Sequence, residues 1–276
     1  MTRFAAAFFA VLFLAGAAFA ETPFERGRYL VSAVLNCGNC HTPKGPDAGK
    51  LLSGGMRFDL PEYHVVAPNL TPDRDTGLGR WSDADIKKAL VEGMRPNGVR
   101  LAKVMPSAFY GIMSNDDLNA VVAYLKSVPP ISNKVDAPVY TLAPKHAVFP
   151  GADKPFTRKD MRTKTQRGFY LATIAHCMEC HTPAQNGEGL FTTELGKGGR
   201  EFKGPWGVSK SANVTSSKTA GLGAWTDAEI KRAITQGISR DGRQLKGPMG
   251  FASYAKMTNQ DIDAVVAWLR TLPPKD

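Results

Sequence analysis

Hydrophobic side chains recur at helical spacing in several short segments of the chain. The clearest case follows Ser114, where apolar positions lie three or four residues apart and share one face of a helix. These positions are Leu118, Val121, Val122 and Leu125. Residues 261–269 repeat the pattern near the C-terminal end. The spacing therefore predicts helices rather than strands.

The predicted helices share a recognisable first turn. A Ser or Thr is followed three residues later by an acidic residue, and such a pair satisfies free backbone N–H groups at a helix N-terminus. The pairs are Thr22 and Glu25, Ser82 and Asp85, Ser114 and Asp117, Thr226 and Glu229, and Thr258 and Asp261. Between helices, residues 42–79 are interrupted by glycine and proline and carry few strand signals. A loop of this length is uncommon unless it wraps around a bound group, so we predict an all-α fold with long loops.

The first twenty residues have a different pattern. Arg3 precedes an apolar run at residues 4–15, and a small-x-small sequence ends at Ala20. These are the three parts of a secretory signal peptide, so residues 1–20 are predicted to be removed and the mature chain to begin at Glu21. An uncleaved N-terminal anchor is the alternative, although the apolar run is short for a membrane span. The rest of the sequence has no second run of this kind, so no transmembrane span is expected after cleavage.

The mature sequence contains two copies of one module. The matching pairs are residues 26–30 with 167–171, 77–86 with 221–230, and 117–125 with 261–269. We predict two tandem domains, residues 21–127 and 165–276, each with about three helices. The residues between them, 128–164, contain six prolines and are expected to form an extended linker over the surface.

Two short motifs contain all four cysteines of the chain, Cys37-Gly-Asn-Cys-His41 and Cys177-Met-Glu-Cys-His181. Two thiols three positions apart with a histidine directly after them are typical of haem c attachment, because the thiols add to the haem vinyl groups while the histidine binds the iron. A disulfide, a redox dithiol or a zinc site is the alternative, but pooling the cysteines around zinc leaves both histidines unexplained. We predict two covalently bound haem c groups. The attachment residues are Cys37, Cys40, Cys177 and Cys180, and the iron ligands are His41 and His181.

Methionines supply the candidates for the second axial ligand. Two methionine pairs recur in register between the modules, Met105 with Met249 and Met113 with Met257. Met113 and Met257 each precede a helix start, where an apolar residue packs onto the first turn. Met105 and Met249 lie in loops beside proline, and we predict that they bind the irons; core filling is the alternative. His/Met ligation leaves no open position in the resting state and favours electron transfer over chemistry at the iron.

Charge is distributed unevenly along the chain, whose formal net charge is +10. Residues 21–140 carry 14 basic and 13 acidic side chains, whereas residues 141–276 carry 20 and 12, so only the second half is strongly basic. A basic surface suits nucleic acid, anionic lipid or an acidic protein. Two haem groups favour the last of these, so we predict a redox partner protein and no nucleic acid.

The loop sequences of both modules carry a family resemblance. The first module contains Ala67-Pro-Asn-Leu-Thr-Pro-Asp73, Thr76-Gly-Leu-Gly79, Trp81-Ser-Asp83 and Met105-Pro106, and the second contains Asn213-Val-Thr215, residues 219–223 and Trp225. In these segments the chain resembles the cytochrome c subunits of membrane-associated alcohol, gluconate and aldehyde dehydrogenases, over nearly all of its mature length. Those subunits generally carry three haem motifs, whereas this chain has two. The second module also has Gly250 after its methionine, where the family prefers proline.

The resemblance implies cytochrome c domains that hold haem c at the two motifs, with Met105 and Met249 as the sixth ligands. It also implies electron transfer from a partner dehydrogenase toward a quinone or respiratory oxidase, in the periplasm, where bacteria attach haem c. The sequence shows no flavin, quinone-cofactor or nucleotide motif, so we predict an electron carrier rather than an enzyme. The alternative is a dihaem redox enzyme of the peroxidase or thiosulfate dehydrogenase type, with one unusually ligated haem.

Overall fold

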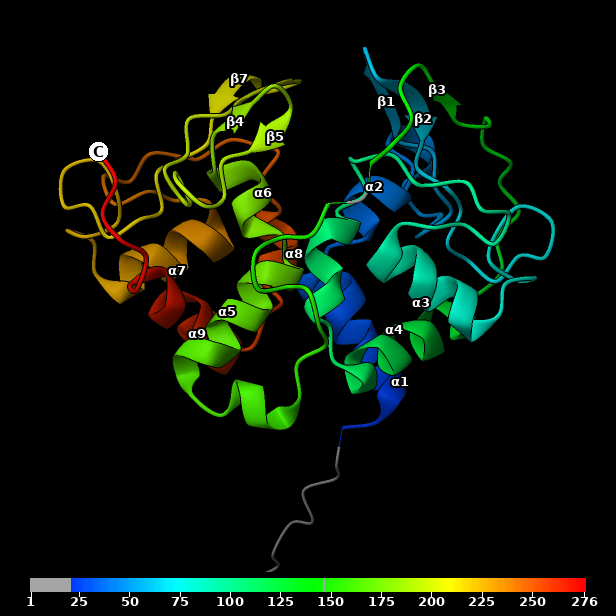
Figure 1. Ribbon diagram of the computed structural model, residues 1–276, viewed down its shortest axis with the longest axis horizontal. Helices are drawn as coiled ribbons and strands as arrows, with labels where there is room; N and C mark the ends of the chain where they lie inside the picture. The colour runs from blue at the N-terminus through cyan, green and yellow to red at the C-terminus, as the bar shows by residue number, and fades with distance from the viewer. Residues whose placement is uncertain (1–20, 146) are drawn as a thin grey trace, which may run out of the picture.

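The computed structural model describes residues 21–145 and 147–276, so the predicted signal peptide lies outside the described residues. Two similar halves lie side by side (Figure 1). The helices of the first half are α1 (Pro23–Tyr29), the π-helical segment η1 (Leu30–Val34), α2 (Gly38–His41), η2 (Gly45–Asp47), α3 (Asp83–Glu92), the 3-10 helix η3 (Ser107–Ile112) and α4 (Asn115–Ser127). Those of the second half are η4 (Arg158–Met161), α5 (Lys164–Ile174), α6 (Cys177–His181), α7 (Asp227–Gln236), α8 (Phe251–Tyr254) and α9 (Asn259–Leu269).

Five helices begin at the predicted Ser or Thr residues, which confirms the pattern of first turns. The caps are Thr22 for α1, Ser82 for α3, Ser114 for α4, Thr226 for α7 and Thr258 for α9. In α1, α3 and α7 the acidic residue bonds back to the cap. In α4 and α9 the corresponding Asp117 and Asp261 are buried and bond to other helices.

The first and last long helices of each half cross at very close range. Gly27 in α1 faces α4, and Gly168 in α5 faces α9. A Cβ atom at Gly27 would lie 2.0 Å from the carbonyl oxygen of Ala120, and one at Gly168 would lie 1.9 Å from that of Ala264. Glycine is therefore needed at this crossing because no other residue leaves the backbone bare.

The prediction of an all-α fold is wrong. Only 36% of the chain is helical, and 10% forms strands in three small antiparallel sheets within the described residues. The strands are β1 (Arg57–Leu60), β2 (Tyr63–Val66), β3 (Val139–Tyr140), β4 (Ala184–Gln185), β5 (Glu188–Gly189), β6 (Glu201–Gly204) and β7 (Gly207–Lys210). Their order is β1-β2-β3, β4-β5 and β6-β7. The long predicted loops thus fold into hairpins above the helices (Figure 1).

The missed hairpin of the first half has a short alternating pattern. In β2, Tyr63 and Val65 are buried while His64 between them is exposed, which is the two-residue period of a strand. Four residues are too few for this period to stand out among the surrounding glycines and prolines. The third strand, β3, comes from the predicted linker and pairs Tyr140 with Tyr63, a contact between segments far apart in sequence.

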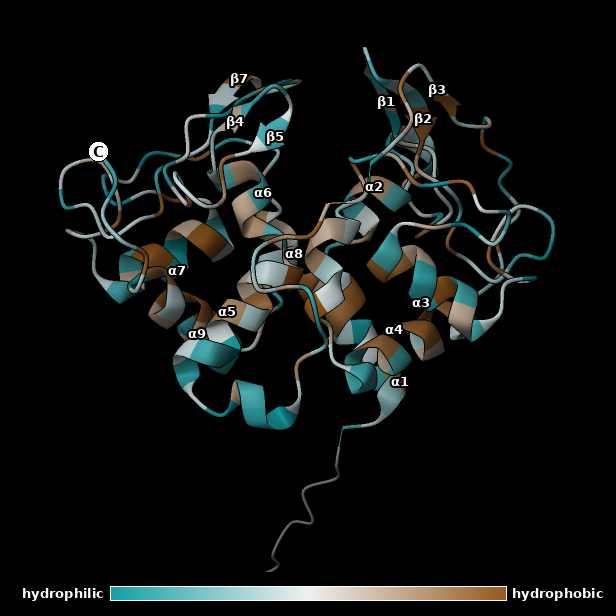
Figure 2. Cartoon of the chain, in the orientation of Figure 1, coloured by the Kyte–Doolittle hydropathy of each residue, from teal (hydrophilic) through white to brown (hydrophobic). Residues whose placement is uncertain are grey.

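One hydrophobic core extends through both halves. The connecting segment contributes Phe149, which is buried and whose ring lies 4.9 Å from that of Phe109 in the first half and 5.1 Å from that of Phe191 in the second. Figure 2 shows helices with both hydrophobic and hydrophilic positions, and outer loops that are mostly hydrophilic. Among the residues that the structure describes, none of the helices has the length and apolar character needed to cross a bilayer.

Candidate haem-binding sites

Each predicted attachment motif lies in a short helix, α2 after η1 in the first half and α6 after α5 in the second. The chain turns sharply before the first cysteine of each motif. Asn36 and His176 make these turns with φ angles of 52° and 44°, in the left-handed region that few residues other than glycine adopt. The two motifs are therefore presented by the same local geometry, although their turn residues differ.

The histidine of each motif is oriented by a backbone carbonyl group. Nδ1 of His41 lies 2.8 Å from the oxygen of Pro68, and Nδ1 of His181 lies 2.8 Å from the oxygen of Ala212. A carbonyl oxygen can only accept, so Nδ1 carries the proton and Nε2 keeps its lone pair. Burial lowers the pKa of both histidines, which favours the neutral imidazole that a metal requires.

The four cysteine side chains are free thiols, and each is partly exposed. Burial raises the pKa of Cys37, Cys177 and Cys180 to about 12. Cys37 and Cys177 pack against the edge of the hydrophobic core. Within residues 21–145 and 147–276, no group of three or more His, Cys, Asp or Glu side chains is arranged to hold a metal ion.

The two pairs of methionines lie in different environments. Met113 and Met257 are buried in the core, whereas Met105 and Met249 are only partly buried. The loops of Met105 and Met249 have the same backbone turn, because each methionine carbonyl accepts from the N–H two residues later, at 2.8 Å and 3.0 Å. Repeated loops thus present two thioethers that the hydrophobic core does not fully cover.

Two buried tyrosines lie near the cysteines, and sequence reasoning missed them. Tyr110 follows Met105 and Tyr254 follows Met249, at matching positions of the repeat. Burial raises the pKa of both, and the nearby thiols raise it further: Cys37 and Cys40 for Tyr110, and Cys177 and Cys180 for Tyr254. Their identical place in the two modules was the available sequence signal.

A buried donor without a partner gives an independent test of whether an acidic group fits the second haem-binding site. Among the described residues, Nε1 of Trp206 is buried and has no hydrogen-bond partner. The Trp206 ring lies against Gly247, in the loop that carries Met249. An unpaired buried N–H is costly, and a carboxylate such as a haem propionate would satisfy it. The thiols, the oriented histidine, the thioether and this donor together fit a haem group.

Comparison with known proteins identifies the class. The family model described as Cytochrome c matches residues 24–129 and again residues 165–273, so the chain belongs to the cytochrome c family and contains two cytochrome c domains. The predicted resemblance is confirmed. With one attachment motif in each domain, the chain carries two haem c groups, and electron transfer is the function of such domains.

Several curated proteins are similar over most of this chain. The fructose dehydrogenase cytochrome subunit of Gluconobacter japonicus is 29% identical over 91% of this chain and 53% of its own length. The gluconate 2-dehydrogenase cytochrome c subunit of Pantoea cypripedii is 28% identical over 77% and 51%, respectively. A diheme cytochrome c-type protein of Cereibacter sphaeroides is 29% identical over 74% and 70%. The chain thus spans about half the length of the two dehydrogenase subunits.

Proposed function

We propose that this protein is a periplasmic electron-transfer cytochrome that accepts electrons from a partner dehydrogenase and passes them toward the respiratory chain. It does so through two haems in domains placed at residues 21–127 and 165–276. The observation that carries the proposal is the repetition of one complete ligand set in both domains. In each, a carbonyl-oriented histidine and a partly exposed methionine accompany two partly exposed thiols.

The proposal assigns one role to each residue of that set. The thiols of each motif would hold the haem covalently, and the imidazole Nε2 and the thioether sulfur would be the ligands of its iron. The attachment residues are Cys37, Cys40, Cys177 and Cys180, and the axial ligands are His41 with Met105 and His181 with Met249.

Haem c supplies reversible one-electron exchange at its iron, and the chain controls the conditions of that exchange. The Nδ1–H bonds to Pro68 and Ala212 hold each imidazole in one tautomer and raise its basicity as a ligand. A thioether in the sixth position raises the reduction potential and occupies the site that peroxide would need. The buried rings of Tyr110 and Tyr254 exclude water next to the cysteines.

The identity of the partner is supported by the relatives and by the charge. The relatives from Gluconobacter japonicus and Pantoea cypripedii are cytochrome subunits of dehydrogenases. The positive excess of residues 141–276 suits docking to an acidic surface of such a partner. Substrate oxidation then takes place in the partner, and this chain acts as the carrier.

The ligand assignment is tested with five variants of the full-length holoprotein. Met105→Ala and Met249→Ala should each remove about half of the methionine-to-iron absorption band of the oxidised protein, and the double variant should remove all of it. Met113→Leu and Met257→Leu are the matched controls, since these buried side chains are assigned to packing, and they should keep the full band. An undiminished band in both alanine variants would refute the assignment. A high-spin haem in the unmodified protein, with peroxide turnover, would instead favour a dihaem redox enzyme.

A further inference from the structure

The repeated Arg-Gly-x-Tyr-Leu segments have no role in the haem sites, yet the first arginine and the tyrosine of each segment form hydrogen bonds. The arginine of each segment pairs with an aspartate of its own domain. Arg26 donates to both carboxylate oxygens of Asp117, at 2.7 Å and 2.9 Å, and Arg167 donates to Asp261 at 2.6 Å. These pairs join the first and last long helices within a domain.

The tyrosine of each segment crosses to the other domain. Tyr29 in α1 donates its hydroxyl proton to Asp261 in α9 at 2.6 Å, and Tyr170 in α5 donates to Asp117 in α4 at 2.5 Å. In return, the backbone N–H of Thr258 donates to the Tyr29 oxygen at 3.2 Å, and that of Ser114 to the Tyr170 oxygen at 3.3 Å. Each tyrosine hydroxyl is therefore hydrogen-bonded to the first turn of the other domain's last helix.

These contacts are reciprocal. The residues of the Tyr29 contact and those of the Tyr170 contact occupy equivalent positions of the sequence repeat. The two domains therefore meet through the same surface on both sides, as in a two-fold symmetric dimer. Each aspartate accepts hydrogen bonds from the arginine of its own domain and from the tyrosine of the other. The glycine of each segment brings the two helices of its domain into the close crossing that places the aspartate beside both donors.

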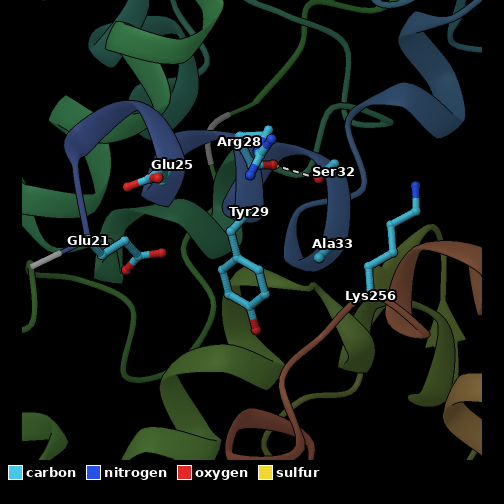
Figure 3. Close-up of a pocket in the computed structure, with 7 residues that line it drawn as sticks. All are labelled: Glu21, Glu25, Arg28, Tyr29, Ser32, Ala33 and Lys256. Carbon is cyan, nitrogen blue, oxygen red and sulfur yellow. Dashed lines mark hydrogen bonds between the residues drawn. The ribbon is translucent and has the colours of Figure 1, made fainter. Parts of the chain in front are cut away.

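The two crossings differ in their access to solvent. Tyr170 is 1% exposed, and its ring stacks on Phe156 of the connecting segment with centroids 6.1 Å apart. Tyr29 lies at the base of an open cleft between the domains, with Glu25 and Arg28 of α1 above it and Lys256 of the second domain on the far side (Figure 3). The Tyr29 crossing is therefore the one that can be altered with the least disturbance of the core.

The helices that carry the two tyrosines precede the haem attachment motifs in the chain. Tyr29 is on the helix that runs to Cys37, and Tyr170 is on the helix that runs to Cys177. We propose that Tyr29 and Tyr170 are positioning residues: their hydroxyl groups hold the two haem domains in one mutual orientation and thereby set the rate of electron exchange between the haems. The part that concerns electron exchange rests on the function proposed above.

The experiment compares full-length holoprotein carrying Tyr29→Phe, Tyr170→Phe or both changes. Pulsed electron paramagnetic resonance of the two ferric haems gives the distribution of iron–iron distances, and flash reduction gives the rate of exchange between them. Each lost hydroxyl should raise the ratio of open to closed arrangements about tenfold, as expected for one hydrogen bond to a charged group. The distance distribution should broaden and the exchange slow, most of all in the double variant.

Tyr124→Phe is the matched control, because Tyr124 is a partly buried tyrosine of α4 whose ring lies 5.5 Å from Phe24 of its own domain. It should keep the original distances and rate. If the double variant does not fold, Tyr29→Phe alone decides, since that side chain borders solvent. An unchanged distance distribution and exchange rate in Tyr29→Phe and Tyr170→Phe would overturn the proposal. The methionine-to-iron band is recorded in every variant, so an error in the axial ligands would be seen separately.

Discussion

The two cytochrome c domains share one scaffold but cover their hairpins differently. In the first domain, β2 pairs with β3 from the connecting segment, and Tyr63, Val65 and Ala102 form a small core beneath the sheet. In the second domain, the hairpin β6-β7 has two strands within the described residues, and Trp206 at its turn lies against Gly247. Residues repeated in both domains thus form the shared scaffold, whereas residues that differ determine how the hairpin of each domain is covered.

The two domains also differ in the solvent exposure of their proposed iron ligands. His41 is 7% exposed, whereas His181 is only partly buried, although both make the same Nδ1 bond at 2.8 Å. The positive excess of the chain also lies in the second half. Solvent exposure and charge both act on reduction potential and on docking. We therefore expect the second haem to face the partner and the first to be the more enclosed.

The largest expected effect is the loss of one haem. Cys37→Ser with Cys40→Ser, and Cys177→Ser with Cys180→Ser, should each leave one covalent haem per chain, because each pair of thiols holds its own group. Electrospray mass and the pyridine haemochrome spectrum give the count. Met178→Leu, a buried change inside the second motif, is the control and should keep two haems. Two covalent haems in either double variant would contradict the assignment of the cysteines.

The next effect tests whether the helix crossings of the two domains are equivalent. Gly27→Ala and Gly168→Ala place a Cβ atom about 2 Å from a backbone oxygen, so each should destabilise the holoprotein by about 1–3 kcal/mol or more. Denaturant unfolding provides the measurement. Gly49→Ala is the control, since nothing lies within 4 Å of its Cβ position, and it should change stability by less than about 0.5 kcal/mol. A small cost at one crossing only would show that the domains tolerate strain differently.

The sequence predicted those features that depend on local or repeated signals. The helix starts at Ser82 and Thr226 could be read from neighbouring residues, and the family from the repeated motifs. The strands could not, because the hairpins β1-β2, β4-β5 and β6-β7 have strands of only two to four residues, too short for their period to stand out. In addition, β3 forms only where the chain folds back onto Tyr63.

Some contacts of the haem-binding sites and between the domains could not be predicted from the sequence either. The carbonyl groups of Pro68 and Ala212 orient the histidines, but a backbone oxygen leaves no mark in a sequence. The crossings of Tyr29 and Tyr170 needed the relative placement of two domains, which no local pattern encodes. The repetition of Arg-Gly-x-Tyr-Leu was visible, although its meaning was not.

A smaller effect tests the hydrogen bond of Tyr29 through its dependence on pH. Burial, and then the bond to Asp261, raise the pKa of Tyr29 to about 12, from an ordinary value near 10. The neutral tyrosine is the favoured form in the folded protein, so its contribution is complete below about pH 10 and is lost as the pH rises toward 12. The melting-temperature difference between the unmodified protein and Tyr29→Phe should therefore shrink over that range. A difference that stays constant to pH 12 would contradict the assigned hydrogen bond.

The smallest effect concerns docking and tests the charge difference between the domains. Lys203 and Lys210 are exposed on the open hairpin of the second domain, and Lys44 and Lys88 are exposed lysines of the first. Electron exchange with the proposed partner dehydrogenase should slow as ionic strength rises, because salt screens charges farther apart than about 10 Å at 0.1 M. At low salt, Lys203→Gln with Lys210→Gln should slow the exchange a few-fold, whereas Lys44→Gln with Lys88→Gln should have little effect. Equal slowing by both pairs would mean that net charge alone steers the partner, and a rate independent of salt would mean that charge does not steer it at all.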